Sequence, residues 1–342
     1  MTAPAQSLRV SASGICCAVG YTAEASACAL RAGLDHFQES TFVAEDGSPV
    51  RIARLPETDI WGAPRLARWA ARAIEACLAS IAATERHSIP ILLLTASLSR
   101  PMSEERAQFE TARAAQAALD RTFPPHSRII PGDRAALGTG LALARQLLDQ
   151  EQLPGVLVVG LDSYLNAASI NHYLSEERLL VPGNRDGFIP GEAAAAVLLE
   201  RSRPDTSGLH VIGIGQGQES GRPDGSVPSR AQGLSHAIRA AVADAGADAA
   251  DLDFRLSDQN GEGFFAREAA NALTRVAVPG GHKLPTLTTA DCTGEIGAAT
   301  GPLMLAWLHR LLAHANAPGR CGLIHLASDE GARCALIVRH QP

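Results

Sequence analysis

The stretch "RDGFIPGEAAAAVLLE", residues 185–200, joins a tight acidic turn to a long apolar run. Arg185, Asp186 and Gly187 form the turn, and Gly191 stands just before the apolar run. A continuous run of alanine, valine and leucine that follows turn residues is typical of a strand buried on both faces. Such a strand needs helices on both sides of its sheet, so this stretch favours an α/β fold.

The length and composition of the chain support the same fold class. At 342 residues the chain exceeds what one hydrophobic core usually organises, so we expect two domains or two similar halves packed as one unit. Hydrophobic residues make up 46% of the sequence and aromatic residues 4%, with 31 glycines and 20 prolines. This composition is typical of a close-packed, alanine-rich α/β protein and excludes a disordered or fibrous chain.

The charge pattern excludes two classes of partner. The formal net charge is -6 and no long basic run is present, so neither a nucleic acid nor an anionic membrane is an expected partner. No segment reaches the roughly 18 consecutive apolar residues of a membrane-spanning helix. The opening "MTAPAQSLRV" lacks the pattern of a signal peptide, so we expect a cytoplasmic protein.

The cysteines give no sign of a disulfide framework or a metal site. Their number is odd and no CxxC pair occurs, which favours reduced thiols. The eleven histidines are scattered without ligand spacing, so we expect neither a metal nor another cofactor. The cysteines are Cys16, Cys17, Cys28, Cys77, Cys292, Cys321 and Cys334.

Strands and helices are predicted to alternate along the chain. In the first half we expect strands at residues 8–19, 89–95, near 127–131, at 155–163 and at 193–200, with helices after residue 22, from Pro64 and from Ala135. After the linker "RSRPDTSG" the same alternation returns and again ends on an apolar strand, "CALIVRH". The pattern predicts a duplicated α/β unit, with one half at residues 1–203 and the other at residues 204–342.

Three segments resemble a known family. "VSASGICCAVGYTAEASACALRAGLDHF" is similar to the opening of the β-ketoacyl synthases of the thiolase superfamily. "VLVVGLDSYLN" with residues 185–200 resembles the end of their first half, and "TTADCTGEIGAATGPLMLAWLHRLL" resembles a segment that carries a catalytic histidine. The resemblance implies a thiolase-like, five-layered αβαβα fold of two pseudo-symmetric halves. It also implies a homodimer, with the strand at residues 127–131 available to pair across it.

The catalytic residues of that family are missing. The family uses a cysteine thiolate at the start of a buried helix and two histidines in glycine-rich turns. At the matching positions this chain has Arg134 in "RIIPGDRAALGTG", Asn260 in "QNGEG" and Glu295 in "TGEIG". Because all three residues have changed while the glycines around them persist, we expect that the carbon–carbon bond-forming condensation is lost. We also expect the three positions to lie near one another, between the two halves.

Other conspicuous residues are better explained by structure than by chemistry. Asp186, Gly187, Gly191 and Glu192 are expected to form a structural turn, because glycines first meet backbone needs. His282, in "PGGHKLP", is expected at the surface.

Three thiols and one helix start also have structural explanations. Cys16 and Cys17, on the first strand, are expected in the core, as is Cys292 near Glu295. Arg134 beside Asp133 fits an anion-binding helix start or an ion pair that fills a lost pocket.

Two functions remain open from the sequence. The first is a pseudoenzyme, a ketosynthase-like scaffold that binds a protein partner as an adaptor or chaperone. Similar short proteins occur with bacterial type VI secretion effectors, so the resemblance implies an effector or an acyl carrier protein as partner. The second is a divergent acyl-thioester hydrolase or acyltransferase, with Glu295 as general base and Asn260 as oxyanion donor.

Overall fold

The first half of the chain contributes one group of five strands. The structure is a computed structural model that describes residues 6–56, 60–203, 205–276 and 284–342. The strand order is β5–β4–β6–β7–β1, with β4 parallel to β5 and β6, and β7 antiparallel to both of its neighbours. The strands are β1 (Leu8–Cys16), β4 (Ile91–Thr95), β5 (Arg128–Pro131), β6 (Val156–Ser163) and β7 (Glu192–Arg201).

The second half repeats this arrangement strand for strand. Its order is β10–β9–β11–β12–β8, with β9 parallel to β10 and β11, and β12 antiparallel to both of its neighbours. A short antiparallel pairing of β1 with β8 joins the two groups. The strands are β8 (Gly208–Gln218), β9 (Phe254–Ser257), β10 (Thr286–Thr288), β11 (Cys321–Ala327) and β12 (Ala332–Gln341). The exact division at residues 203 and 204 stays a prediction.

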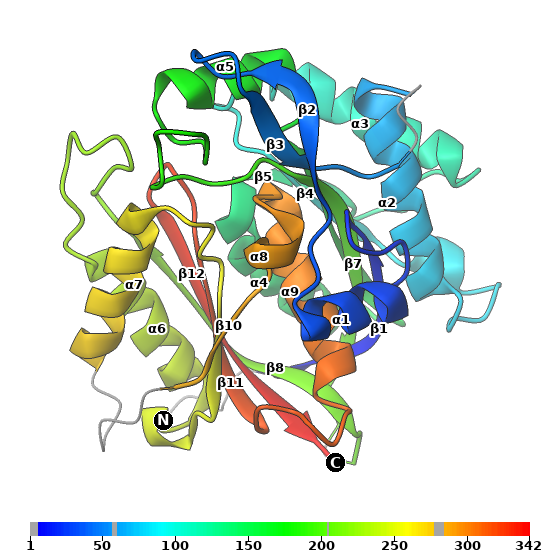
Figure 1. Ribbon diagram of the computed structural model, residues 1–342. Coiled ribbons are helices and arrows are strands. Elements are labelled where there is room, and N and C mark those ends of the chain that lie inside the picture. The colour runs from blue at the N-terminus through cyan, green and yellow to red at the C-terminus, as the bar shows by residue number, and fades with distance from the viewer. Residues whose placement is uncertain (1–5, 57–59, 204, 277–283) are drawn as a thin grey trace.

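Helices fill the space between the two strand groups and cover their outer faces (Figure 1). Two helices, α4 and α9, pack between the groups, and ten of the twelve residues of α9 are buried. In the first half α2 covers β1, β6 and β7 and packs against α3, while in the second half α6 covers β8 and β12 and packs against α7. The result is five layers. The helices are α2 (Gly62–Leu78), α3 (Glu105–Ala118), α4 (Ala136–Gln150), α6 (Gln232–Ala245), α7 (Gly263–Val276) and α9 (Thr300–Leu311).

The opening stretch of the sequence lies where its composition predicts. Residues 193–199 of β7 have no solvent exposure, because β6 and β1 flank the strand and helices pack on both faces. Small alanines allow both helix layers to approach this strand closely.

Several peripheral elements do not follow from the sequence pattern. A hairpin of β2 and β3, the helices α3 and α5, and the short α8 were not predicted. The first strand was predicted to continue to residue 19 but ends at Cys16, because Cys17 and Gly20 form a tight turn through paired backbone hydrogen bonds. The bounds are α1 (Ala23–Ala32), β2 (Phe37–Val43), β3 (Pro49–Ala53), α5 (Ala167–Ser175) and α8 (Ala290–Thr293).

Glycines set the contact between β8 and α6. Gly213, Gly215 and Gly217 alternate along β8, so they share one face of the strand. A Cβ atom at Gly215 would overlap the carbonyl oxygen of Ala237 on α6. The backbone of the helix therefore lies directly against the backbone of the strand.

The substitution Gly215→Ala tests this contact. The added methyl group must push α6 away from β8, so we expect the free energy of unfolding to fall by about 2 kcal/mol or more. Gln216→Ala, at an exposed side chain on the opposite face of the same strand, where the side-chain contact given is a long hydrogen bond from Thr139 at 3.3 Å, is the control and should change it by less than about 0.5 kcal/mol. Denaturant unfolding measures both. Equal effects of the two variants would show that the close approach does not limit stability.

Candidate functional site

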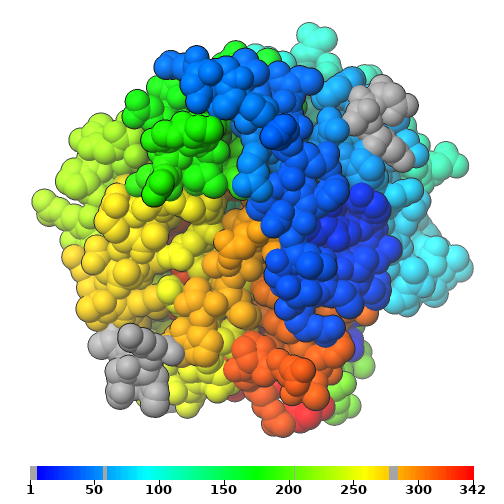
Figure 2. Space-filling model, viewed as in Figure 1, coloured from blue at the N-terminus to red at the C-terminus, as the bar shows by residue number. Residues whose placement is uncertain are grey.

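Three loops from different parts of the chain bring the predicted site residues together. Arg134 lies in the turn Asp133–Ala135, just before α4. Asn260 follows β9, and Glu295 follows α8. On the face shown in Figure 2, the segment coloured orange, near residue 295, lies beside the segment coloured yellow, near residue 260.

Glu295 is the common partner of the other two residues. Nη1 of Arg134 lies 3.1 Å from Oε2 of Glu295. The side-chain amide of Asn260 donates to the same oxygen at 2.7 Å. The backbone N–H of Gly297 donates to Oε1 at 2.8 Å. Both carboxylate oxygens of Glu295 are therefore occupied by donors from its own chain.

Arg134 is enclosed on all sides by acceptors and an aromatic ring. Only 3% of its surface is exposed. Its guanidinium donates to the carbonyl oxygen of Asp258 at 3.3 Å, and lies 3.6 Å from the carboxylate of Asp258 and 3.7 Å from that of Asp329. The ring of Phe265 covers it at 4.4 Å. Burial alone would lower the pKa of Arg134, but the carboxylates raise it above its usual value, so the residue stays charged.

A second arginine connects the same loops. Arg178 makes two hydrogen bonds to Glu262, at 2.7 and 3.1 Å, and two to Asp329, at 2.8 and 3.1 Å. Asn260 donates to Glu262 at 2.9 Å and so joins this pair to Glu295. Two hydrogen bonds from one guanidinium to one carboxylate fix the relative orientation of the two groups as well as pairing their charges.

A third arginine holds the loop before Arg134. Arg100 binds Asp133 at 2.8 Å and Asp162 at 2.7 Å, and its guanidinium stacks on Tyr164 at 3.8 Å. Asp133 has a left-handed backbone, with φ of 53°. Asp133 pairs with Arg100, whereas Arg134 pairs with Glu295. That an ion pair fills a lost pocket stays a prediction; the ion pairs present join Arg134 to Glu295 and Arg100 to Asp133, not the neighbours Asp133 and Arg134.

The buried acids have perturbed pKa values. Burial raises the pKa of Glu295, Asp258 and Asp133, and the nearby arginines only partly offset this effect. A raised carboxyl pKa favours the protonated form. Without the guanidiniums, burying these acids in charged form would be far more costly.

This geometry leaves little room for the chemistry that the sequence left open. As a general base Glu295 would need a free oxygen, and both of its oxygens already accept hydrogen bonds. As an oxyanion donor Asn260 would need a free N–H, but its amide nitrogen donates to Glu262 and Glu295. Neither Arg134, Asn260 nor Glu295 lines any of the three cavities described for this structure.

No thiol joins this network. All seven cysteines are free. Cys16, Cys17 and Cys292 are buried, as expected, and Cys292 belongs to the central apolar core. Burial raises the pKa of the Cys292 thiol to about 11 and that of Cys16 to about 12, so both thiols are protonated at neutral pH.

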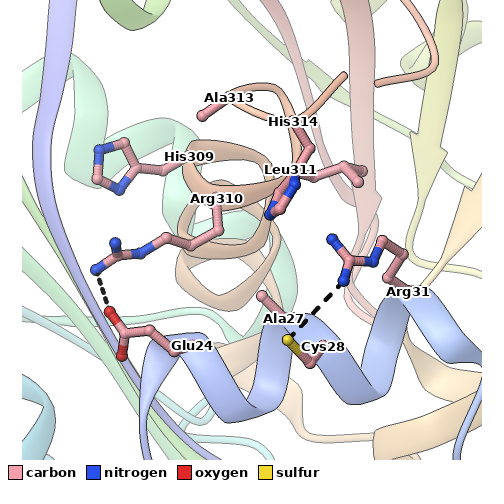
Figure 3. A pocket seen from close by; sticks show the side chains of 9 residues that line it. All are labelled: Glu24, Ala27, Cys28, Arg31, His309, Arg310, Leu311, Ala313 and His314. Atoms are coloured by element: carbon pink, nitrogen blue, oxygen red, sulfur yellow. Dashed lines mark hydrogen bonds and ion pairs between the residues drawn. The ribbon is translucent and has the colours of Figure 1, made fainter. Parts of the chain in front are cut away.

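Cys28 is the exposed thiol, and it lines a different cavity. This cavity, of about 400 Å³, lies between α1 and the end of α9. Figure 3 shows Arg31 directed towards the Cys28 sulfur and Arg310 paired with Glu24, while the ring of His309 points away from the thiol. His309 instead contacts the hydroxyl of Ser13 at 2.9 Å through Nδ1. Among the described residues, the Cys28 sulfur accepts from Arg31 and is bonded to neither histidine of the cavity, His309 or His314.

The acidic residues of the opening stretch make hydrogen bonds within the chain. Asp186 accepts a hydrogen bond from the N–H of Gly263 at the start of α7, at 2.5 Å. Glu192 is buried and accepts from the N–H of Leu55 at 3.0 Å, and it also pairs with Arg65. His282 lies outside the described residues.

Other members of the network were not predicted from the sequence. Arg100, Asp258 and Asp329 each follow a buried strand, β4, β9 and β11 respectively. Charged residues at the carboxyl ends of neighbouring strands gather at one edge of a sheet. Their position after buried strands could have identified these residues as candidates from the sequence.

Among the described residues, no group of three or more histidine, cysteine, aspartate or glutamate side chains is arranged to hold a metal ion. In the same part of the chain, no helix combines the length and apolar character needed to cross a membrane.

Solved structures share this fold. A structure of a type II polyketide synthase acyl-carrier protein in complex with its ketosynthase matches with a TM-score of 0.80 at 12% identity, over 98% of this chain and 100% of that one. A ketosynthase of Xenorhabdus doucetiae in complex with its chain length factor gives 0.72 at 16%, over 98% of both chains. A β-ketoacyl synthase of Burkholderia phymatum gives 0.76 at 16%, over 98% and 100%.

These matches confirm the thiolase-like αβαβα fold of two pseudo-symmetric halves. No family model matches the sequence, and no curated protein matches it. At such identities the likeness to solved structures establishes the fold alone.

Removal of the Arg134 guanidinium should leave buried acids without their positively charged partner. Arg134→Met leaves Glu295 and Asp258 charged without their partner, so we expect a loss of about 3–5 kcal/mol in the free energy of unfolding at pH 7. Because the folded-state pKa values of these acids then rise further above their unfolded values, the loss should shrink as the pH falls to 5.

The control for this prediction is Arg106→Ala. Arg106 pairs with Glu110 on the surface, where its side chain is 86% exposed, and its loss should change stability by less than about 0.5 kcal/mol. Denaturant titration at both pH values measures the two variants. An Arg134→Met deficit that stays constant or grows on acidification would contradict the role given to the buried acids.

Proposed function

We propose that this protein is a ketosynthase-fold scaffold that has no condensing activity and acts by binding a protein partner, as an adaptor or chaperone. The observation that carries the proposal is the position of Arg134. It stands at the start of α4, where the resemblance implies a cysteine, and its guanidinium is tied to Glu295 and buried. A guanidinium is not a nucleophile and cannot hold an acyl group.

The two other changed positions support the same proposal. The condensation needs donors for a developing oxyanion and enolate. At the matching positions, the side-chain amide of Asn260 donates to the carboxylates of Glu262 and Glu295. The carboxylate of Glu295 would itself repel an enolate. The same region also holds Arg100, which stacks on Tyr164 and pairs with Asp133.

The alternative, a divergent acyl-thioester hydrolase or acyltransferase, has one observation in its favour. Burial raises the pKa of Glu295, as a general base near neutral pH requires. Its two occupied oxygens count against that role. Both functions use the same residues, so a chemical test separates them.

The proposed homodimer forms along the exposed edge of β5. This strand ends the sheet and pairs on one side only, with β4. The N–H of Gly132 donates to Thr95 on β4, so by alternation the backbone groups of Ile129 face outward. We propose that a second copy of this chain pairs here. The structures with similar folds include complexes of a ketosynthase with its chain length factor and with an acyl-carrier protein.

The partner beyond the dimer is proposed from the resemblance. An effector of a type VI secretion system and an acyl carrier protein are the two candidates. The free thiols fit a reducing compartment, which we propose to be the cytoplasm. Purification of the protein from its native host, followed by mass spectrometry, would distinguish the two candidates.

A test with acyl thioesters decides between scaffold and enzyme. After incubation with acyl- and malonyl-carrier thioesters, we expect no acyl adduct on the intact protein, no condensed product and no hydrolysis above background, because no free nucleophile or base lines the site. Intact-protein mass spectrometry and thiol release measure these outcomes. A stable adduct, most tellingly on Cys292, would overturn the scaffold proposal. Hydrolysis that Glu295→Gln abolishes would establish the alternative.

The proposed dimer is tested with Ile129→Pro. Proline removes the outward N–H of residue 129 but leaves the hydrogen bonds to β4, so we expect a dimer for the native chain and a monomer for the variant. Arg128→Ala, at the neighbouring exposed residue, is the control and should stay dimeric. Light scattering at micromolar concentration measures the mass. A strict monomer for the native chain would contradict the dimer.

A further inference from the structure

A large apolar cavity opens on the outer side of the first half, and Asp162, a partner of Arg100, lies in its wall. Its volume is about 550 Å³, within the range of small-molecule sites, roughly 300–1,000 Å³. It lies between the start of α2, the inner face of α3 and the carboxyl ends of β4 and β6. Crevices at the carboxyl ends of parallel strands are the usual ligand sites of open α/β sheets.

The mouth of this cavity carries unusually exposed apolar side chains. Trp61 is 61% exposed and Met102 is 71% exposed, and both line the cavity. Leu66 of α2 and Ala107 of α3 form facing walls further in. Exposed aromatic and methionine side chains around a hollow are typical of a binding site rather than of an ordinary surface.

The inner wall of the cavity carries two carboxylates, and each is paired with an arginine. Asp162 is paired with Arg100, and Glu192 is paired with Arg65. A cation would therefore find no free carboxylate at this wall, and transfer of its charge from water would be costly. Arg54 also lines the cavity and has no ion pair among the described residues, so the lining does not exclude an acidic ligand.

One hydroxyl on the wall lacks a hydrogen-bond partner. Thr95, the last residue of β4, lines the cavity and is 5% exposed, and its Oγ1 has no partner among the described residues. A buried hydroxyl without a partner is costly, and the hydroxyl of Thr95 can donate one hydrogen bond. A ligand carbonyl at this wall would satisfy it.

We propose that this cavity binds an apolar molecule that carries a carbonyl group, with the carbonyl accepting from Thr95. The site is separate from the degenerate catalytic positions, because none of Arg134, Asn260 and Glu295 lines it. The proposal does not depend on the protein-binding role. A scaffold and an enzyme could both use such a site.

The probe for the test is 6-propionyl-2-(dimethylamino)naphthalene, a neutral naphthalene with one ketone whose fluorescence reports the polarity around it. We expect saturable binding at one site, with the emission shifted to the blue. Ala107→Trp fills the cavity and should weaken binding at least tenfold. Ala117→Trp, at an exposed position of the same helix, is the matched control and should leave binding unchanged.

The hydrogen bond has its own test. Thr95→Val keeps the shape of the side chain and removes the hydroxyl, so binding of the ketone should weaken by about three- to tenfold. Binding of N-phenyl-1-naphthylamine, which has no carbonyl group, should not weaken. Equal effects on both probes would overturn the role of Thr95.

The site itself is overturned by either of two results. One is the absence of saturable binding by the native chain, and the other is binding that Ala107→Trp leaves intact. If Ala107→Trp does not fold, as judged by circular dichroism, Ala63→Trp on the facing wall replaces it, with the same expected loss.

Discussion

The ion pair between Arg134 and Glu295 is the interaction on which the rest of this site depends. It joins the start of α4, from the first half, to the turn after α8, from the second half. These two charges are contacted by the side chains of Asn260, Asp258 and Asp329. A pair buried at this depth is stable only if every donor and acceptor is satisfied. The network thus constrains the loops that, in a ketosynthase, would have to leave room for a substrate.

The duplicated fold explains why so many charges meet in one place. Both strand groups have the same order and directions, so the loops after β4, β5, β9 and β11 converge from both sides. Each loop supplies a charged residue where its strand ends. These loops place guanidiniums and carboxylates together. The proposed binding role rests on the resemblance, which implies a thiolate and two imidazoles at the matching positions.

The sequence predicts the core better than the edges. The apolar runs at residues 91–95 and 193–199 predict buried strands because burial on both faces leaves no polar alternation. Arg134, Asn260 and Glu295 were predicted as site positions because the glycines around them still match the motifs of the family that the sequence resembles. Arg100 and Arg178 were not, because an arginine in a loop carries no sign of its distant partner. The hairpin of β2 and β3 is short and half-exposed, so its pattern is weak.

A double-mutant cycle on Arg134 and Glu295 tests the account most directly. The variants are Arg134→Met, Glu295→Gln and the pair together, and the measurement is the free energy of unfolding at pH 7. If the two charges depend on each other, the double variant should be more stable than the sum of single losses predicts, with a coupling energy of about 2 kcal/mol or more. Losses that add within about 0.5 kcal/mol would contradict the claim that this ion pair organises the site.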